Sequence, residues 1–318
     1  LDTLYGTILG QTAIDGSGWI DLGAKPERYR LDAELKNFNL NELVDGTFKS
    51  DITGDIDLKG RGLSGASLRL DIGCELHESS FDEYPLQNAS GTIVVTTDSI
   101  FFADSFEVHY FENIFYAGGT VVYSGDMDLK VVADLQNLDR YRGKLFIDEL
   151  AGRALAEAHL TGQTSDPDLQ ATVTSDSIWI YELHADSFEV TGQLDRFLTG
   201  RQGSLDITAV NGTAWKVPYD TLFGRLGLDS NVVNLDSVAV GMPDSRFMAK
   251  GSFDYLAAPM RLRLDTLHAI FMEREFHNDG PMRIQIDSLG FVFDTLSLAN
   301  PRASFDASGR FNYDQSMQ

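Results

Sequence analysis

The residues that could perform catalysis or bind a metal are scattered through this sequence. No two histidines stand at the i, i+2 or i, i+4 spacing from which zinc sites are built. Residues 77–80 read His-Glu-Ser-Ser and place a base beside a nucleophile, but the glycines of a Gly-x-Ser-x-Gly elbow are absent. We therefore predict a protein that is not an enzyme, with no catalytic residue, no metal site and no cofactor. The histidines are His77, His109, His159, His184, His268 and His277.

Acidic residues dominate the charge of the chain. The 48 Asp and Glu residues outnumber the 25 Lys and Arg residues, which leaves a formal net charge of −23. Because Asp and Glu fill most polar positions, a nearby pair of carboxylates does not by itself indicate a glycosidase. A surface of this sign repels nucleic acid and anionic membranes, so we predict that neither is the main partner. The acidity is expected to keep the protein soluble and to prevent sheet edges from associating.

Apolar and polar residues alternate along the whole chain, which is the period of strands with one apolar and one polar side. The runs 68–72, 127–131, 205–207 and 282–286 show this alternation. Turn residues recur about every 8 to 12 positions, which predicts about 26 antiparallel strands. We interpret the tripeptide of Asp, Ser or Thr, and a large apolar residue as a turn whose apolar residue begins the next strand. This motif begins at Asp2, Asp98, Asp104, Asp176, Asp186, Asp220, Asp236, Asp265, Asp287 and Asp294.

An internal repeat is visible in the sequence. Asp-Ser-Phe-Glu-Val occurs at 104–108 and at 186–190, each time after Asp-Ser-Ile and two bulky apolar residues, at 98–102 and 176–180. The second copy contains four extra residues, in which we expect a hairpin tip. Self-similarity of this kind predicts a repeat architecture. We expect residues 1–318 to form one continuous segment of a longer protein, with degenerate repeats at approximately 38–137, 138–216 and 217–318.

Three local patterns give further expectations. Residues 41–44 and 148–157 are candidate short helices between strands, and Asn211 with Gly212 is typical of a hairpin turn. Aromatic residues gather near Phe102 and Phe106, where they either plug the core or line an apolar groove. The same two interpretations apply to Trp19, Trp179 and Trp215. The aromatic stretch consists of Phe101, Phe102, Phe106, Tyr110, Phe111, Phe115, Tyr116 and Tyr123.

The predicted fold class is all-β, an elongated, curled antiparallel sheet with an apolar concave face. Sheets rarely exceed about ten strands without curling or splitting. A curled sheet that stays open along one seam does not fill its own interior, which leaves an apolar groove for an apolar guest. The residues expected to line this groove are Ile56, Leu58, Leu68, Leu70, Ile72, Ile93, Val95, Ile100, Phe102, Phe106, Val108, Leu129, Val131, Ile178, Ile180, Phe188, Val190, Leu205, Ile207, Leu226, Leu228, Leu262, Leu264, Ile284, Ile286, Phe291 and Phe293.

Two stretches resemble the repeat of TamB and other AsmA-like proteins, in which a strand, a glycine, a turn with Asp-Pro and another strand follow one another. The first stretch contains Leu138, Asp139, the run 156–162, Asp166, Pro167 and the alternating Leu169, Ala171 and Val173. The second contains Phe38, Leu40, Leu43 and the run 54–60, with Leu63, Ser64 and Gly65 in place of Asp-Pro. The resemblance spans most of the chain.

The resemblance implies a β-taco or repeating β-groove fold, with a long sheet folded around an apolar groove. It also implies a lipid-transfer protein whose groove carries phospholipid acyl chains between the inner and outer membranes of diderm bacteria. The chain would then be a periplasmic segment of an envelope protein anchored in the inner membrane. An N-terminal anchor and a C-terminal domain that meets an outer-membrane barrel protein are both missing from the sequence. We expect them outside it.

Two other functions remain open. The chain could be an elongated structural or adhesive β protein with a fully packed interior that supports protein assembly, or a β-helical carbohydrate enzyme. A continuous interior cavity distinguishes a conduit from a packed protein. The single cysteine, Cys74, excludes an intramolecular disulfide framework and any metal site with several cysteines, and we expect it in the core.

Overall fold

The computed structural model describes residues 4–8, 12–39, 49–63, 65–81, 84–143, 147–200, 202–271 and 273–312. These residues form 21 strands and two short 3-10 turns, and they contain no α-helix. All the strand pairings are antiparallel, which confirms the predicted all-β class. Their internal contacts divide the chain into two compact units. Unit 1 consists of Leu1–Asn137 and Leu155–Pro167, and unit 2 consists of Leu138–Ala154 and Asp168–Gln318.

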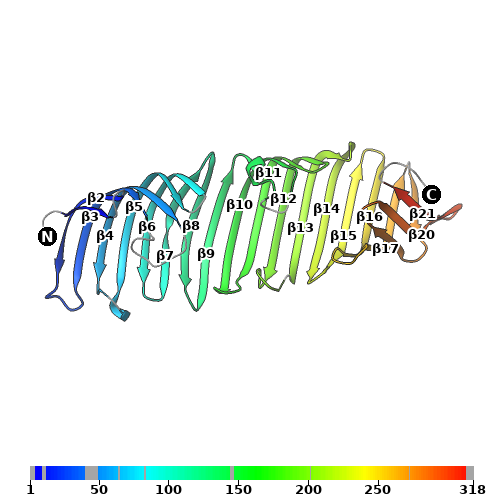
Figure 1. The fold of residues 1–318 in the computed structure, drawn as a ribbon. Coiled ribbons are helices and arrows are strands. Elements are labelled where there is room, and N and C mark those ends of the chain that lie inside the picture. The colour runs from blue at the N-terminus through cyan, green and yellow to red at the C-terminus, as the bar shows by residue number, and fades with distance from the viewer. Residues whose placement is uncertain are drawn as a thin grey trace. The chain divides into compact units, whose positions relative to one another are not determined.

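In unit 1 each strand pairs with the next one along the chain (Figure 1). Neighbours in sequence are therefore neighbours in the sheet. The strands are β1 (Leu4–Ile8), β2 (Thr12–Asp21), β3 (Arg28–Phe38), β4 (Ser50–Arg61), β5 (Arg69–Phe81), β6 (Tyr84–Thr96), β7 (Ser99–Tyr110), β8 (Asn113–Val122), β9 (Asp126–Leu135) and the part of β10 (Leu150–Gln163) from Leu155 onward.

Unit 2 follows the same rule until β17, which pairs with both β18 and β19. Asn278 fills the break between these two short strands. Its side-chain oxygen accepts from the amide of Leu267 at 2.7 Å, and its side-chain nitrogen donates to the carbonyl of Asp265 at 3.0 Å. The strands are β11 (Asp168–Ile180), β12 (Leu183–Asp195), β13 (Gln202–Ala214), β14 (Val217–Asp229), β15 (Val232–Met242), β16 (Ser245–Asp254), β17 (Met260–Phe271), β18 (Arg274–Asn278), β19 (Met282–Ile286), β20 (Gly290–Asn300) and β21 (Ala303–Asn312).

Most copies of the Asp, Ser or Thr, apolar motif lie inside strands, which corrects their interpretation as turns. At the motif in β7, β15, β17 and β20, the register of pairing with the neighbouring strand shifts. In β11, β12 and β14 the aspartate of the motif has no partner in the register, although the register does not shift. The bulges, where the register changes, bend a strand and increase its twist. The strands are therefore longer and fewer than the predicted 26. The aspartates concerned are Asp104, Asp176, Asp186, Asp220, Asp236, Asp265 and Asp294.

The remaining copies of the motif behave as predicted or cannot be placed. Asp98 and Asp287 lie at turns, and the Oδ1 atom of Asp287 accepts from the amides of Leu289 and Gly290 at 2.8 and 3.1 Å. Asp2 lies outside the described residues. The same side-chain chemistry thus serves both a turn and a strand bend.

Hydroxyl groups replace ladder hydrogen bonds where β3, β4 and β5 bend. Ser79 is buried, and its hydroxyl accepts from the amide of Thr53 at 3.0 Å and donates to the carbonyl of Thr53 at 3.1 Å. The Thr53 hydroxyl in turn accepts from the amide of Asn37 at 3.2 Å. Because buried backbone groups need partners, these bonds stabilise the bend.

Two local predictions were wrong. The candidate helix at 148–157 is mostly strand β10, in which Ala154, Ala156 and Ala158 alternate with the exposed Arg153, Leu155 and Glu157. Asn211 and Gly212 lie inside β13, where Asn211 takes the left-handed backbone at φ 51°. The candidate helix at 41–44 lies outside the described residues.

The hairpin tips lie elsewhere. Trp215 and Lys216 connect β13 to β14, with φ values of 49° and 66°. Tyr181 and Glu182 connect β11 to β12, so the extra residues of the second repeat copy do contain a hairpin tip. In the first copy, residues 99–108 run continuously through β7.

Candidate functional site

Cross-strand partners collect the predicted lining residues of unit 1 on one side of its sheet. The row Leu31, Leu58, Ile72, Ile93 and Phe102 crosses β3 to β7 and continues to Gly119 and Leu129. Leu68 lies just before β5 and so outside the strands. We call this the apolar side of unit 1. It includes the predicted residues Ile56, Leu58, Leu70, Ile72, Ile93, Val95, Ile100, Phe102, Phe106, Val108, Leu129 and Val131.

Unit 2 has an apolar side of the same kind. One row runs from Leu205 through Leu226, Leu235 and Gly251 to Leu264, with each residue opposite the next. Ile178 and Ile180 lie beyond the bend at Asp176, near the tip between β11 and β12, and Ile178 is buried. The predicted residues on the apolar side of unit 2 are Phe188, Val190, Leu205, Ile207, Leu226, Leu228, Leu262, Leu264, Ile284, Ile286, Phe291 and Phe293.

Burial on these apolar sides is uneven. Some buried residues lie beside register shifts: Leu35, Phe38 and Ile52 form one cluster in unit 1, where the pairing of β3 and β4 shifts. In unit 2, Ala185 and Ala209 are completely buried near Asp186 and Asn211, which the ladder of β12 and β13 skips.

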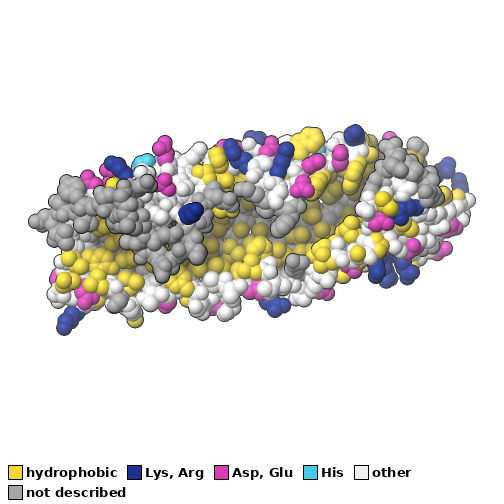
Figure 2. All heavy atoms as spheres, in the orientation of Figure 1, with side chains coloured by type: hydrophobic (Ala, Val, Ile, Leu, Met, Phe, Trp, Pro, Cys, Tyr) yellow, Lys and Arg dark blue, Asp and Glu magenta, His cyan; other side chains and the backbone are white. Residues whose placement is uncertain are grey.

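Away from the bends, large apolar side chains remain half-buried. This group includes Leu205, Ile207, Leu226, Leu228 and Leu262. Large aliphatic residues in a closed core are usually buried completely. Figure 2 shows hydrophobic side chains gathered on a hollowed part of the surface. Each unit thus keeps apolar surface that its own described residues do not cover.

The aromatic residues divide between the two sides of the sheet. Phe102 and Phe106 belong to the apolar side, whereas Phe101 is 41% exposed. The tryptophans do not fill the core, because Trp19, Trp179 and Trp215 are 51%, 49% and 79% exposed. Trp19 stands opposite Arg30 on the polar side, and Trp215 lies at the tip between β13 and β14. The ring of Trp179 stacks instead on His184, with centroids 4.0 Å apart.

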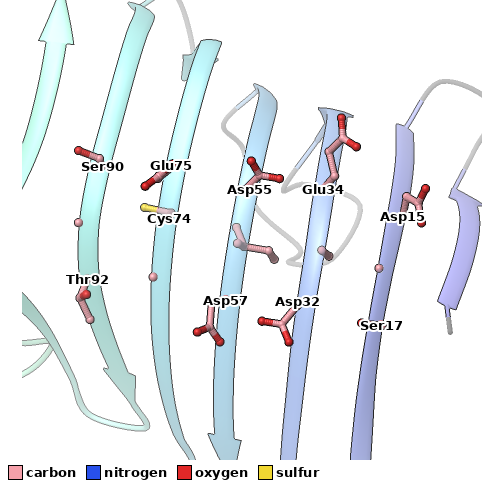
Figure 3. Close-up of a pocket in the computed structure, with 15 residues that line it drawn as sticks. Asp15, Ser17, Asp32, Glu34, Asp55, Asp57, Cys74, Glu75, Ser90 and Thr92 are labelled. Atoms are coloured by element: carbon pink, nitrogen blue, oxygen red, sulfur yellow. The ribbon is translucent and has the colours of Figure 1, made fainter. Parts of the chain in front are cut away.

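The polar side of unit 1 separates acidic from basic residues. Two neighbouring rows of carboxylates line a hollow of about 900 Å³ (Figure 3). Arg30 connects these rows to the basic residues: its Nε atom lies 3.2 Å from Asp32 and its Nη2 atom 3.4 Å from Asp57. The hydrogen bond to Asp32 raises the pKa of Arg30. The carboxylates are Asp15, Asp32, Glu34, Asp55, Asp57 and Glu75.

Sequence alternation predicted a polar side but not this separation of charge. Which charges meet depends on which residues of different strands stand opposite one another, and one strand alone does not contain that information. Among the described residues, no three His, Cys, Asp or Glu side chains form a group able to hold a metal ion. Cys74 lies half-buried on the apolar side, where burial raises the pKa of its thiol.

No family model, no curated protein and no solved structure matches the chain. Within the ranges that the structure describes, no helix is long and apolar enough to cross a membrane.

Proposed function

We propose that this protein is a non-enzymatic lipid-transfer conduit whose apolar sides hold the acyl chains of phospholipids. One observation supports this function most directly: large residues such as Ile207 and Leu262 remain half-buried although they belong to continuous apolar rows. Contiguous apolar surface that is not fully buried is typical of an interaction site.

An acyl chain is a suitable guest because its interaction with such a surface has no preferred direction. Each methylene that leaves water gains about 0.8 kcal/mol. The total holds the lipid, while the absence of oriented hydrogen bonds leaves the chain free to slide from one strand to the next. No single residue is then essential, and a row of similar side chains is sufficient.

The resemblance to TamB and AsmA-like proteins supplies the expected setting. The chain would be a periplasmic segment that passes phospholipids between the inner and outer membranes, with an inner-membrane anchor and an outer-membrane barrel partner outside this sequence. A structural or adhesive protein with a packed interior is the competing function, and it predicts that no lipid is bound.

Native mass spectrometry with lipid extraction tests the proposal on protein purified from a diderm bacterium. We expect bound phospholipid in the wild type and its loss in the double variant Ile207→Asp, Leu262→Asp, because a charge on the apolar side is costly to desolvate. Thr208→Asp with Thr266→Asp is the matched control, since it adds the same charge to β13 and β17 at exposed positions. A stable wild type without lipid would contradict the conduit and favour the packed structural protein.

A further inference from the structure

Three arginines stand side by side on adjacent strands of unit 1. Arg28 begins β3, Arg61 ends β4 and Arg69 begins β5, and the register places Arg28 opposite Arg61 and Arg61 opposite Arg69. Adjacent strands lie about 4.8 Å apart, and like charges directly opposite one another destabilise a sheet. This row is notable in a chain with a net charge of −23.

A second row of the polar side, two residues along each strand, completes the cluster. It contains Trp19, Arg30 and Lys59, which stand opposite one another in that order. Together with the arginine row these residues line a hollow of about 550 Å³. Trp19 is half-exposed at its border.

Carboxylates neutralise only part of this cluster. Arg30 pairs with Asp32 and Asp57, Lys59 pairs with Asp57 at 3.2 Å, and Arg69 pairs with Asp71 at 2.7 Å.

The other two arginines have no such partner. Within the described residues, Arg28 and Arg61 form no ion pair and no side-chain hydrogen bond. Asp21 stands opposite Arg28, but its Oδ1 atom accepts from the amides of Gly23 and Ala24. Two adjacent guanidinium groups are therefore available to an anion from solution.

We propose that Arg28, Arg61 and Arg69 bind the phosphate group of a phospholipid. A guanidinium presents a planar fork of donors that matches phosphate oxygens two at a time, which makes arginine the preferred residue for phosphate recognition. The arginines lie at strand ends, and the next residue of each strand, such as Tyr29 or Leu70, belongs to the apolar side. One amphiphile can thus place its phosphate on the arginines and its acyl chains on the apolar side. This inference rests on the proposed lipid function.

Calorimetry on the full chain tests the site with three probes: dihexanoyl phosphatidic acid below its micelle concentration, dihexanoylglycerol and inorganic phosphate. We expect phosphatidic acid to bind most tightly, and Arg28→Gln with Arg61→Gln to weaken its binding on the order of 10- to 100-fold, because hydrogen bonds to charged groups are the strong ones. Arg246→Gln with Arg302→Gln removes the same charge from exposed positions of unit 2 and should leave the affinity unchanged.

Each contrary outcome has a separate meaning. Unchanged binding of phosphatidic acid in the Arg28→Gln, Arg61→Gln variant, or an equal loss in the control variant, overturns the phosphate site while dihexanoylglycerol binding still supports the conduit. Phosphate that binds as tightly as phosphatidic acid overturns the assignment to a lipid headgroup. If neither lipid binds the wild type, the proposed function fails together with this inference.

Discussion

The rings of Phe102 and Phe106 meet edge to face, with centroids 5.6 Å apart, across the bend of β7. Between them, the three residues 103–105 of β7 stand opposite the single residue Gly118 of β8. Because β7 has two extra residues here, both phenylalanines stay on the apolar side. Edge-to-face pairs of this kind are a favoured arrangement of aromatic rings. The bulge therefore bends the strand while its apolar side stays continuous.

Deletion of a bulge residue should be tolerated. Without Asp236, Ser237 and Leu235 become the regular partners of Arg225 and Leu226, and every apolar residue of β15 keeps its side. We expect a folded protein whose thermal midpoint falls only slightly.

Deletion of Thr208 from the regular part of β13 is the control for this experiment. It moves half a strand to the wrong side, and full burial of a large apolar side chain is worth about 1.5–3 kcal/mol, so each half-buried one that is exposed costs part of that figure. Circular dichroism melts of both variants check the prediction, and equal destabilisation would contradict the assigned register.

Gly251→Ala should be strongly destabilising. A Cβ atom at this position would lie 1.9 Å from the carbonyl oxygen of Arg263 on β17, so backbone would have to move. Overpacking of this kind typically costs about 1–3 kcal/mol. Gly224→Ala is the matched control, because its nearest neighbour would be the Ile207 side chain at 3.8 Å. In urea unfolding, the free energies of unfolding of the two variants should differ by at least about 1 kcal/mol. Similar midpoints would show that the backbones of β16 and β17 adjust freely.

Arg61→Gln should stabilise the protein in phosphate-free buffer. The substitution removes the central charge of three arginines that stand opposite one another, and relief of such a contact is worth roughly 0.2–1 kcal/mol. Arg30→Gln should give no comparable gain, since Arg30 already pairs with Asp32 and Asp57. Urea midpoints at low ionic strength provide the measurement, and a loss of stability in Arg61→Gln would argue against repulsion in the row.

Acid should weaken unit 2 through Asp287. The hydrogen bond from Arg310, followed by those from the amides of Leu289 and Gly290, lowers the pKa of Asp287 in the folded protein. A lowered pKa contributes stability that is fully present above the unfolded pKa of about 3.9 and is lost as the pH falls through the lower folded value. In Asp287→Asn, the thermal midpoint should therefore fall less than in the wild type as the pH is lowered.

Asp279→Asn is the control for that titration, because Asp279 is exposed in the connection between β18 and β19. We expect it to keep the acid limb of the wild type. An unchanged acid limb in Asp287→Asn would show that other carboxylates govern the response.

The sequence alone predicted a chain of antiparallel strands, because the alternation around residues such as Ile207 and Leu262 is visible without knowledge of their partners, although it predicted too many strands. It did not predict the bends. Aspartate and serine bond to nearby backbone in turns and in bulges alike, so Asp236 within a strand and Asp287 at a turn have the same local pattern. The sequence also did not predict the arginine row, because Arg28 and Arg61 become neighbours only through the register in which β3 and β4 pair. The alanines of β10 indicated a helix, and tertiary packing made them a strand.

The pairing of nearly every strand with its immediate predecessor has a consequence for how the chain acquires its structure. When consecutive strands pair, the residues that come together are close in sequence, so little chain entropy is lost. Such local topologies fold faster than sheets assembled from distant segments. Within unit 2, the hairpin of β11 and β12 already offers a template on which β13 can add, and each later strand repeats the step. Nucleation can then begin at any hairpin and spread to its neighbours, as in other quasi-one-dimensional proteins.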